Sequence, residues 1–514
     1  MAFADLGVTM ARSKTTKQST VLESYNPATG EPLGSVPVTS PDEVAESLAL
    51  ARRAQRRWAS LSPGERGARL KEFSKILLRE ADDVCARISA ENGKTRQEAL
   101  ITEVLPTVDL INYYGKRADK FLKPKKIPLH LFKHRGSYIH YVPRGVVGII
   151  APWNFPFAIP IGETICALIA GNAVVLKPSE MTPLIAAYAR SAMIRSGLPA
   201  DLFQIIQGGP EVGKALVEAE PDMICFTGSV NGGRKVAEAC GARLIPCVTE
   251  LGGKAPAIIC PDADMERTVS ALAWGGFANS GQVCASVERV YAPASIHDDL
   301  VNRLVKKVRE LRQGDPSSFD TDVGAICLPQ QMDVVQELID DAVANGAVVE
   351  CGGNADSRSL GYFFEPTVLS NVNQNMRVAR EEIFGPVIPI IKVDDVETAL
   401  EYANDSHLGL TAYVFTRDRR KGRALAEKVE AGTVMVNDVM STYGMPETPW
   451  HGIKNSGIGF VHSEDGLRGM CQMRHVHYER IPGIRRELWW YPYSRKTYQG
   501  IMKLMRVAFS KRSL

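Results

Sequence analysis

The sequence predicts an α/β protein with two parallel-sheet domains and a cleft between them. Short apolar segments alternate with helical segments over residues 145–260, and the alternation resumes over about 264–437. Buried strands separated by helices indicate parallel sheets that are covered on both faces. The length of 514 residues also exceeds what one ordinary hydrophobic core organises.

Composition is typical of a soluble globular protein and argues against several other classes. Hydrophobic residues make up 45% and charged residues 23% of the chain, and the net charge of +3 does not indicate a nucleic-acid partner. The ten cysteines form no Cys-x-x-Cys pair and no cluster with histidine at metal-binding spacing. We therefore expect a reducing, cytoplasmic environment, no disulfide framework and no metal site. No apolar run reaches the roughly 20 residues of a membrane-spanning helix.

The N-terminal part is predicted to be a tail followed by a strand and three helices. Residues 1–24 fit a flexible tail better than a transit peptide. A strand is expected over 32–38. Helices are expected over 44–60 and from Ser62 to about Ala90, because each is preceded by Ser-Pro-x-Glu, a capped helix start. A third helical run covers 95–122, and we interpret all three helices as packing elements without catalytic chemistry.

Two α/β series follow. The first has expected strands at Gly145–Pro152, Ala173–Lys177, Phe203–Gln207, Met223–Thr227, Leu244–Thr249 and Pro256–Cys260, and helices at Thr182–Ser196, Glu211–Ala219 and Asn231–Cys240. The second has expected strands at Val287–Ala292, Phe364–Leu369, Val387–Ile391, Ala412–Phe415 and Gly432–Asn437. Two alternating segments outside these series, Ser137–Val142 and Gln472–Tyr478, are expected to join into a small separate sheet.

One cysteine stands apart from the others by its surroundings. Cys284 ends the stretch Phe277-Ala-Asn-Ser-Gly-Gln-Val-Cys284, which follows a helical run of small residues. A nucleophilic thiolate needs an exposed turn, nearby backbone N–H groups and little bulk around the sulfur. A small buried cysteine without chemistry fits the same stretch, so both interpretations stay open here.

Two strand ends in the first series carry residues suited to a nucleotide. Lys177 and Glu180 follow a strand at the edge where open parallel sheets bind ligands, and a carboxylate there can accept hydrogen bonds from ribose hydroxyls. Phe226-Thr-Gly-Ser229 leads into a helix whose N-terminus favours a phosphate. A surface Lys–Glu pair and a plain strand-to-helix turn are the alternatives. No Gly-x-Gly-x-x-Gly motif is present, since Gly208-Gly-Pro-Glu-Val-Gly213 departs from it.

Three further segments place a polar or acidic residue beside prolines or glycines that interrupt regular secondary structure. Asn154, between two prolines, is either an oxyanion donor or a turn residue. Glu250, before two glycines, is either a general base or a solvated strand end. Glu382 and Phe384 precede a Gly-Pro break, where an exposed acid would be ordinary.

Together these segments resemble the NAD(P)-dependent aldehyde dehydrogenase superfamily in order and approximate spacing. The matching motifs are Pro152-Trp-Asn-Phe-Pro156, Lys177-Pro-Ser-Glu180, Phe226-Thr-Gly-Ser229, Glu250-Leu-Gly-Gly-Lys254, Gly281-Gln-Val-Cys284 and Glu382-Ile-Phe-Gly-Pro386. Tyr25-Asn-Pro-Ala-Thr-Gly-Glu31 and Lys454-Asn-Ser-Gly-Ile-Gly459 are also similar to family segments, so the resemblance covers about residues 25–480. Each motif alone is modestly specific, whereas six in order are highly specific.

The resemblance implies a role for each matching residue. Cys284 would attack the aldehyde, while Asn154 and the Cys284 backbone N–H hold the oxyanion. Glu250 would activate the water that hydrolyses the thioester. The implied cofactor-binding residues are Trp153, Lys177, Glu180, Gly213, Gly228, Ser229, Leu251, Glu382 and Phe384.

The resemblance also implies an architecture. Residues 25–122 and 141–250 would form a variant Rossmann NAD-binding domain, and residues 251–450 the catalytic domain. Residues 123–140 and 451–480 would form a small bridging β-sheet that takes part in oligomerisation. A homodimer or homotetramer is expected.

Three carboxylates bear on specificity. Glu180 would repel a 2′-phosphate, so NAD is predicted, with NADP as the alternative. Glu250 favours hydrolysis to a free acid over transfer to coenzyme A. Glu163 stands where many family members carry Lys or another residue close to the substrate tunnel, and an acid there would disfavour a carboxylate-bearing aldehyde.

Residues 481–514 extend beyond the usual end of the family. The segment 485–493 is rich in aromatic and basic residues, and 495–514 contains no acid. Apolar side chains recur at helical spacing, at Tyr498, Ile501, Met502, Met505, Ala508 and Phe509, with Lys496, Lys503, Arg506, Lys511 and Arg512 mostly on other faces. This pattern predicts a basic amphipathic helix, which would bind an anionic membrane surface or pack on the subunit.

The predicted function is NAD-dependent oxidation of an aldehyde to its acid through a thiohemiacetal and a thioester. The substrate is expected to be an apolar medium- or long-chain or aromatic aldehyde, with succinic or a related semialdehyde as the alternative. A non-catalytic NAD-binding or structural protein of the same fold is the alternative of another class. The presence of Cys284, Glu250 and Asn154 together argues against it.

Overall fold

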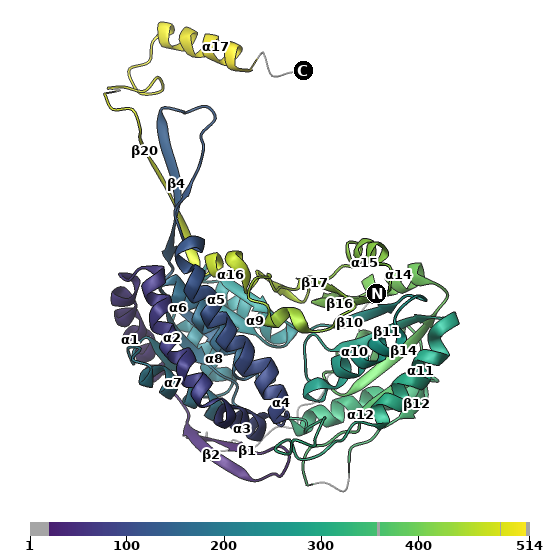
Figure 1. The fold of residues 1–514 in the computed structure, drawn as a ribbon. Helices are drawn as coiled ribbons and strands as arrows, with labels where there is room; N and C mark the ends of the chain where they lie inside the picture. Colours follow the sequence, from purple (N-terminus) through teal and green to yellow (C-terminus); the bar gives the residue numbers. More distant parts are fainter. Residues whose placement is uncertain (1–19, 357–359, 484, 510–514) are drawn as a thin grey trace, which may run out of the picture. The chain divides into compact units, whose positions relative to one another are not determined.

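The computed structural model describes residues 20–356, 360–483 and 485–509 (Figure 1). These residues divide into two compact units. The first comprises the described residues of Met1–Leu122 and Val142–Gln472, and the second those of Lys123–Tyr141 and Met473–Leu514. Most of the expected tail, with Arg12, Lys14 and Lys17, lies outside the described residues.

The first unit contains a six-stranded sheet that includes five of the six strands predicted for the first α/β series. The sixth, predicted at Pro256–Cys260, lies in the second sheet instead, and Gly457–Ile458 adds an edge strand here. The strand order is β19-β9-β8-β5-β6-β7, and all neighbours are parallel except β19 with β9. The strands are β5 (Val146–Ile150), β6 (Ala173–Lys177), β7 (Phe203–Ile205), β8 (Met223–Thr227), β9 (Cys247–Glu250) and β19 (Gly457–Ile458). Every residue of β5 and β6 is buried, as expected for a sheet covered on both faces.

Two strand starts lie three residues later than predicted, and one of them is the strand expected from Phe364, which begins at Thr367. The other strand, expected from Leu244, begins only at Cys247. Leu244 has a φ of 55° and is 90% exposed, so it belongs to the turn before the strand. Leu244 is apolar and lies just before the strand, so the sequence pattern could not separate it from the strand residues.

Helices pack on this sheet and on one another. They are α1 (Pro41–Ala59), α2 (Pro63–Arg79), α3 (Ala81–Asn92), α4 (Arg96–Ala99), α5 (Leu105–Phe121), α6 (Ala158–Ala170), α7 (Pro183–Arg195), α8 (Pro210–Glu218), α9 (Val230–Gly241) and α16 (Ser463–Gly469). Both predicted capping boxes are present, Ser40 with Glu43 and Ser62 with Glu65. The single helix expected from Ser62 to about Ala90 is wrong, because the chain bends at Glu80 and forms α2 and α3.

The second sheet of the first unit has seven strands in the order β12-β13-β14-β11-β10-β16-β17. They are β10 (Ala255–Ile259), β11 (Val287–Pro293), β12 (Val348–Cys351), β13 (Thr367–Val372), β14 (Val387–Val393), β16 (Thr411–Phe415) and β17 (Thr433–Val436). The pairs are parallel except for β12, an antiparallel edge strand that the sequence analysis did not predict.

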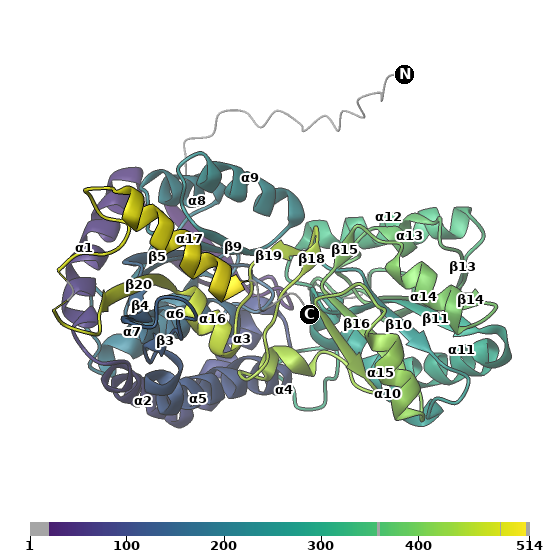
Figure 2. The same ribbon diagram turned by 90° about the horizontal axis from the view of Figure 1, so that it is seen from above.

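Successive residues along a strand of this sheet belong to two different hydrophobic clusters. Ile258 belongs to the cluster with α12 and α14, whereas Ala257 and Ile259 belong to the one with α10 and α11. Figure 2 shows these helix pairs on opposite sides of the strands. Because successive side chains of a strand point to opposite faces of the sheet, each strand packs between two helical layers. The helices are α10 (Met265–Phe277), α11 (Ala294–Arg309), α12 (Pro329–Ala344), α13 (Arg377–Arg380), α14 (Val396–Asn404) and α15 (Arg419–Ala426).

Short elements complete the first unit. β1 (Val21–Tyr25) pairs with β2 (Pro32–Pro37), and β15 (Leu408–Gly409) pairs with β18 (Ile453–Lys454). Three tight turns are helical: the π-turn η1 (Leu100–Val104) between α4 and α5, and the 3₁₀ turns η2 (Ala278–Gly281) and η3 (Ser441–Gly444). Two of these turns, η1 and η2, shape the candidate active site.

The second unit contains the small separate sheet. β3 (Lys125–Lys126), β4 (Arg135–Pro143) and β20 (Cys471–Glu479) form it in the order β20-β4-β3, which confirms that the two distant alternating segments join. Beyond it lies α17 (Arg495–Phe509), the helix expected in the extension. Lys511 and Arg512 lie outside the described residues. Within the described residues, no helix has the length and apolarity needed to cross a membrane.

Candidate active site

Cys284 follows a turn whose backbone depends on a glycine. Asn279 and Ser280 have φ values of 51° and 55°, and Gly281 has a φ of 73°. A Cβ on Gly281 would lie 2.1 Å from the carbonyl oxygen of Gly385, so no larger residue fits there. The expectation of an exposed turn is wrong, because residues 278–283 are all buried and Cys284 itself is only partly accessible.

The cysteine instead lines a cavity of about 460 Å³. Most of the lining is apolar, from Ile101, Leu105, Phe155, Ile159, Trp274, Val283, Met440, Tyr443 and Trp450 among others. Ile101, Leu105 and Trp274 are also exposed, so the cavity reaches the surface through an apolar mouth. Glu98 and Asp109 are its acidic lining residues, and no Lys, Arg or His of the described residues lines it.

Burial and negative neighbours keep the resting thiol protonated. Burial raises the pKa of Cys284 to about 12, and the charges of Glu382 and Glu250 add to the rise. The backbone N–H groups of Cys284 and Ala285 act in the opposite direction. A base or a change of surroundings must therefore assist ionisation when the sulfur attacks.

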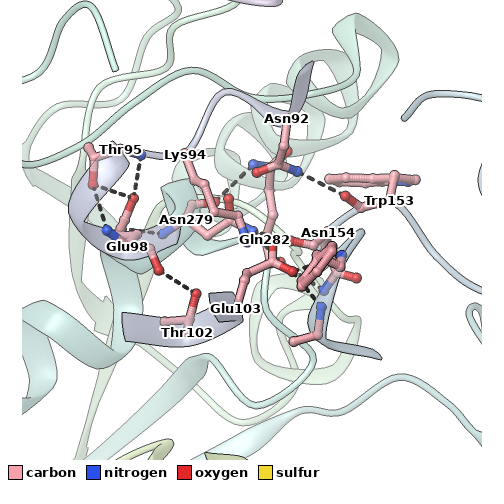
Figure 3. Close-up of polar contacts among 12 residues, drawn as sticks. Asn92, Lys94, Thr95, Glu98, Thr102, Glu103, Trp153, Asn154, Asn279 and Gln282 are labelled. Atoms are coloured by element: carbon pink, nitrogen blue, oxygen red, sulfur yellow. Dashed lines mark hydrogen bonds and ion pairs between the residues drawn. The ribbon is translucent and has the colours of Figure 1, made fainter. Parts of the chain in front are cut away.

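Asn154 lies beside the Cys284 turn. Its side-chain nitrogen donates to the Gln282 carbonyl at 3.0 Å, and its own carbonyl accepts from Asn279 Nδ2 at 3.0 Å and Lys94 Nζ at 2.8 Å (Figure 3). These bonds tie the Pro152–Pro156 loop to the turn. They bring together two residues that are predicted from separate motifs.

A buried ion pair supports this loop from the helical segments. Lys94 Nζ lies 2.7 Å from Glu103 Oε1, and both side chains are fully buried. The other carboxylate oxygen of Glu103 accepts from the backbone nitrogens of Phe157 and Ala158, at 2.9 and 2.8 Å. The interpretation of these helices as packing alone is therefore wrong. A lysine directly after Asn92-Gly93, where α3 ends, was the available sequence signal.

Two more residues of the same region contact the site (Figure 3). Glu98 accepts from the backbone nitrogen of Asn279 at 2.7 Å. Asn92 Nδ2 donates to the Trp153 carbonyl at 2.9 Å. The α3–η1 segment thus holds both the asparagine loop and the cysteine turn.

Glu250 ends β9, deeply buried. Its side chain is 6% exposed, and neither carboxylate oxygen has a hydrogen-bond partner among the described residues. Burial and then the charge of Glu163 raise the pKa of Glu250 well above its usual value, with the Trp450 side chain opposing. Glu163 lies in α6 against Thr227 and is not among the residues that line the cavity.

Glu382 approaches the site from another segment. Gly253 N donates to its carboxylate at 2.9 Å, and a Cβ on Gly252 would lie 2.4 Å from that group. A second buried ion pair, Lys254 with Glu288 at 2.9 Å, holds this segment. Glu288 also accepts from the backbone nitrogens of Ile383 and Phe384. Burial and then Glu288 raise the pKa of Glu382 to about 8.

Two predicted cofactor residues meet through their rings. Trp153 and Phe384 have ring centroids 5.6 Å apart with planes at 85°, an edge-to-face arrangement. They come from segments more than two hundred positions apart. An aromatic pair beside the Cys284 turn forms a wall against which a flat ring can lie.

The predicted nucleotide residues lie at the carboxyl ends of the first sheet. Lys177 Nζ pairs with Glu180 at 2.8 Å. Ser229 caps α9 by accepting from Gly232 N at 3.1 Å, and a Cβ on Gly228 would lie 2.8 Å from the Phe226 ring. Strand ends, a bare glycine backbone and a helix N-terminus together fit the diphosphate and ribose of NAD(P).

The last two predicted cofactor residues are buried in packing positions. Gly213 lies in α8, where a Cβ would make only an ordinary 3.7 Å contact with Ile150. Leu251 packs against Gly233 so closely that a Cβ there would lie 2.3 Å away. Neither residue has a polar side chain, so any side-chain contact with a cofactor would be van der Waals packing.

Comparison with known proteins identifies the family. The model of the aldehyde dehydrogenase family matches residues 14–476. The chain is 38% identical over 455 residues to a Mycolicibacterium smegmatis protein provisionally named as a succinate-semialdehyde dehydrogenase with NADP(+), covering 88% of each. It is 35% identical over 500 residues to the 4,4'-diapolycopene aldehyde oxidase of a Methylomonas species, covering 96% of this chain and 92% of that protein.

Solved structures agree with this match. An aldehyde dehydrogenase from Bacillus cereus in complex with NAD+ is similar with a TM-score of 0.86 and 32% identity, covering 89% of this chain and 93% of that one. The Mycobacterium tuberculosis aldehyde dehydrogenase complexed with NAD+ has a TM-score of 0.85 and 34% identity, covering 90% and 95%. The predicted fold class is thereby confirmed. The chain belongs to the aldehyde dehydrogenase family and is an NAD(P)-dependent aldehyde dehydrogenase.

Proposed function

We propose that this enzyme oxidises an apolar medium- or long-chain or aromatic aldehyde to its carboxylic acid, with NAD as the electron acceptor. The observation that carries the proposal is the cavity that ends at Cys284. Its lining and its exposed mouth are mostly apolar. An apolar chain buried there leaves water at a gain of about 0.8 kcal/mol per CH₂.

The charges of the cavity argue against a semialdehyde. Succinic semialdehyde carries a carboxylate, which needs a cation or several N–H donors when it is buried. The described lining offers Glu98 and Asp109 and no cationic side chain. Glu163 is not among the lining residues, so the lining itself carries this discrimination.

The proposed chemistry begins with the cysteine. The Cys284 thiol loses its proton to solvent, and its sulfur attacks the aldehyde carbon. The oxyanion would accept hydrogen bonds from the Asn154 side-chain amide and the Cys284 backbone N–H. Each such donor is worth roughly 3–4 kcal/mol of barrier. The nicotinamide, when bound, supplies the two-electron oxidation. The product of this half-reaction is an acyl group on Cys284.

Glu250 serves the second half of the proposed reaction. As a carboxylate it takes a proton from water, which attacks the thioester and releases the acid. The pair of glycines after Glu250 keeps this side of the site free of side chains. A free acid, rather than an acyl-coenzyme A, is the proposed product.

We propose that NAD binds along the residues predicted for it. Lys177 and Glu180 would hold the adenosine ribose, and Ser229 with the α9 N-terminus the diphosphate. Glu382 would accept from the second ribose, with Trp153 and Phe384 beside the ring. The carboxylate of Glu180 favours NAD, because a 2′-phosphate next to it would be repelled.

The test is formation of NADH or NADPH over a panel of aldehydes. We expect kcat/KM to rise along straight-chain aldehydes by roughly threefold or more per added CH₂ until the cavity is filled. Succinic semialdehyde should be at least about tenfold poorer than the aldehyde of equal length, and NAD better than NADP. A preference for the semialdehyde would discard the proposed substrate class while leaving the reaction intact.

We further propose that the extension contacts a membrane surface. α17 contains no buried residue, and its described residues with the preceding segment expose Leu488, Trp490, Tyr491, Tyr493, Tyr498, Leu504, Met505, Val507 and Phe509. The acid nearby, Glu487, is buried and paired with Arg135 at 2.6 Å. Lys496, Lys503 and Arg506, which have no ion pair among the described residues, can then face anionic lipid. The match to the 4,4'-diapolycopene aldehyde oxidase covers 96% of this chain, so it includes at least part of this extension.

The liposome test uses the whole chain. At low salt the protein should sediment together with vesicles that contain anionic phosphatidylglycerol. Met505→Glu should reduce the fraction that sediments with them severalfold. Vesicles of neutral phosphatidylcholine serve as the control. Equal retention of the variant and the parent would reject the membrane contact and favour packing on a partner subunit. We propose a cytoplasmic location, since all ten cysteines are free. A homodimer or homotetramer is proposed on the family resemblance.

A further inference from the structure

Glu163 is a carboxylic acid in an otherwise uncharged helix. Every residue of α6 is buried, and Glu163 itself is 5% exposed. Its Oε1 accepts from the Thr227 hydroxyl at 3.3 Å, and its Oε2 has no partner among the described residues. A buried acid that satisfies only one oxygen is costly to keep, which points to a role beyond packing.

The position of Thr227 connects Glu163 with the proposed base. Thr227 ends β8 and pairs in register with Glu250 on β9. Glu163 therefore meets the sheet next to the strand position of Glu250. The charges of both carboxyl groups raise the pKa of the same neighbour, Tyr443.

The groups around the two carboxyls supply no counter-charge. Among the described residues they come from α6, α5, β8, the β4–β5 turn, β9, the cysteine turn, η3 and the segment before α16, and are Cys166, Tyr114, Cys225, Arg144, Cys247, Cys284, Tyr443 and His462. Arg144 acts on Cys225 but forms no ion pair with either carboxyl among the described contacts. Burial holds the pKa of His462 at about 4, so it is neutral at physiological pH.

Two carboxyl groups in such surroundings titrate together. Burial raises the pKa of Glu163 to about 8, and it raises the pKa of Glu250 well above its usual value. Once one group ionises, its charge opposes ionisation of the other. Glu250 must be ionised to take a proton from water, so the state of Glu163 governs when hydrolysis can proceed.

We propose that Glu163 and Glu250 act as one buried carboxyl pair, in which Glu163 is a positioning residue that sets the pH range where Glu250 hydrolyses the acyl-enzyme. The inference rests on the proposed role of Glu250 and goes beyond it. A negative Glu163 raises the pKa of Glu250. Removing that charge lets Glu250 ionise at lower pH, so the acidic limb of hydrolysis moves toward lower pH.

The experiment isolates hydrolysis from the cofactor. An activated ester such as p-nitrophenyl acetate acylates Cys284 with loss of p-nitrophenol, and water then releases acetate, so no oxidant is needed. Steady-state p-nitrophenol release after the initial burst reports deacylation and is followed against pH. We expect Glu163→Gln to shift the acidic limb down by about 1 pH unit with the plateau within about twofold.

Matched variants separate this role from a structural one. Glu163→Asp should restore the limb toward that of the parent, because it keeps the charge. Thr164→Val removes a buried hydroxyl on the same helix, which donates to the Pro160 carbonyl, and should leave the limb in place. Thermal unfolding of each variant shows whether the fold persists.

Each outcome decides one question. An unshifted limb in a folded Glu163→Gln variant overturns the inference, as does an equal shift in Thr164→Val. Glu250→Gln should abolish steady-state deacylation while leaving the burst. If that variant deacylates like the parent, the proposed role of Glu250 fails, which is distinct from failure of the Glu163 inference alone.

Discussion

Replacement of Cys284 by serine is expected to lower NADH formation by about 10⁴-fold or more, because the covalent route is lost. A hydroxyl is a far weaker nucleophile than a thiolate and is harder to ionise in the buried turn. The side chains are nearly isosteric, so the fold and the cavity should persist. The measurement is the initial rate of NADH formation at saturating aldehyde, alongside thermal unfolding.

A second cysteine provides the matched control. Cys351, in the edge strand β12, is also partly accessible but does not line the cavity. Cys351→Ser should retain activity within about twofold, as expected of surface changes. A Cys284→Ser variant with more than a tenth of the parent rate would contradict covalent catalysis at this position.

Replacement of Lys94 by methionine is expected to destabilise the protein by about 3–5 kcal/mol, since Glu103 would keep a buried charge without its cation. The same change removes the Nζ donor to the Asn154 carbonyl. Activity of the folded fraction should therefore also fall, through a looser oxyanion donor. Urea unfolding measures the first effect, and kcat at saturating aldehyde measures the second.

A double-mutant cycle tests the cause. Combining Lys94→Met with Glu103→Leu removes both charges, so the double variant should lose less stability than the sum of the single losses. Arg303→Met breaks an exposed pair with Asp299 on α11 and should leave stability unchanged within error. Strictly additive losses, or a Lys94→Met loss no larger than that of Arg303→Met, would refute a supporting role for the buried pair.

Much of the fold was predictable from local pattern. β6 and β8 occur at the predicted residues, because each is a short buried run ended by Pro178 or Gly228. Both capping boxes were predictable, since Ser, Pro and Glu act within four residues. β12 was not, because its first residues are exposed on an antiparallel edge and lack the apolar run of a central strand.

The candidate site was predictable in its residues but not in its contacts. Motifs singled out Asn154, Cys284 and Glu382 separately. The buried pair of Lys94 with Glu103 escaped prediction, because a lysine and a glutamate in helical segments usually lie in water. Burial here depends on α6 covering them, and α6 lies more than fifty positions further along the chain.

The sequence by itself determined the family and the residues of the proposed chemistry: a cysteine, an amide and a carboxylate in motifs of the aldehyde dehydrogenase family. Tertiary structure alone decided the surroundings of those groups. It placed Glu163 against Thr227, outside the cavity lining, and among the described residues it placed two acids and no cation in that lining. The reason is physical: a residue's reactivity is local, whereas its burial and charged neighbours depend on elements that are distant in sequence.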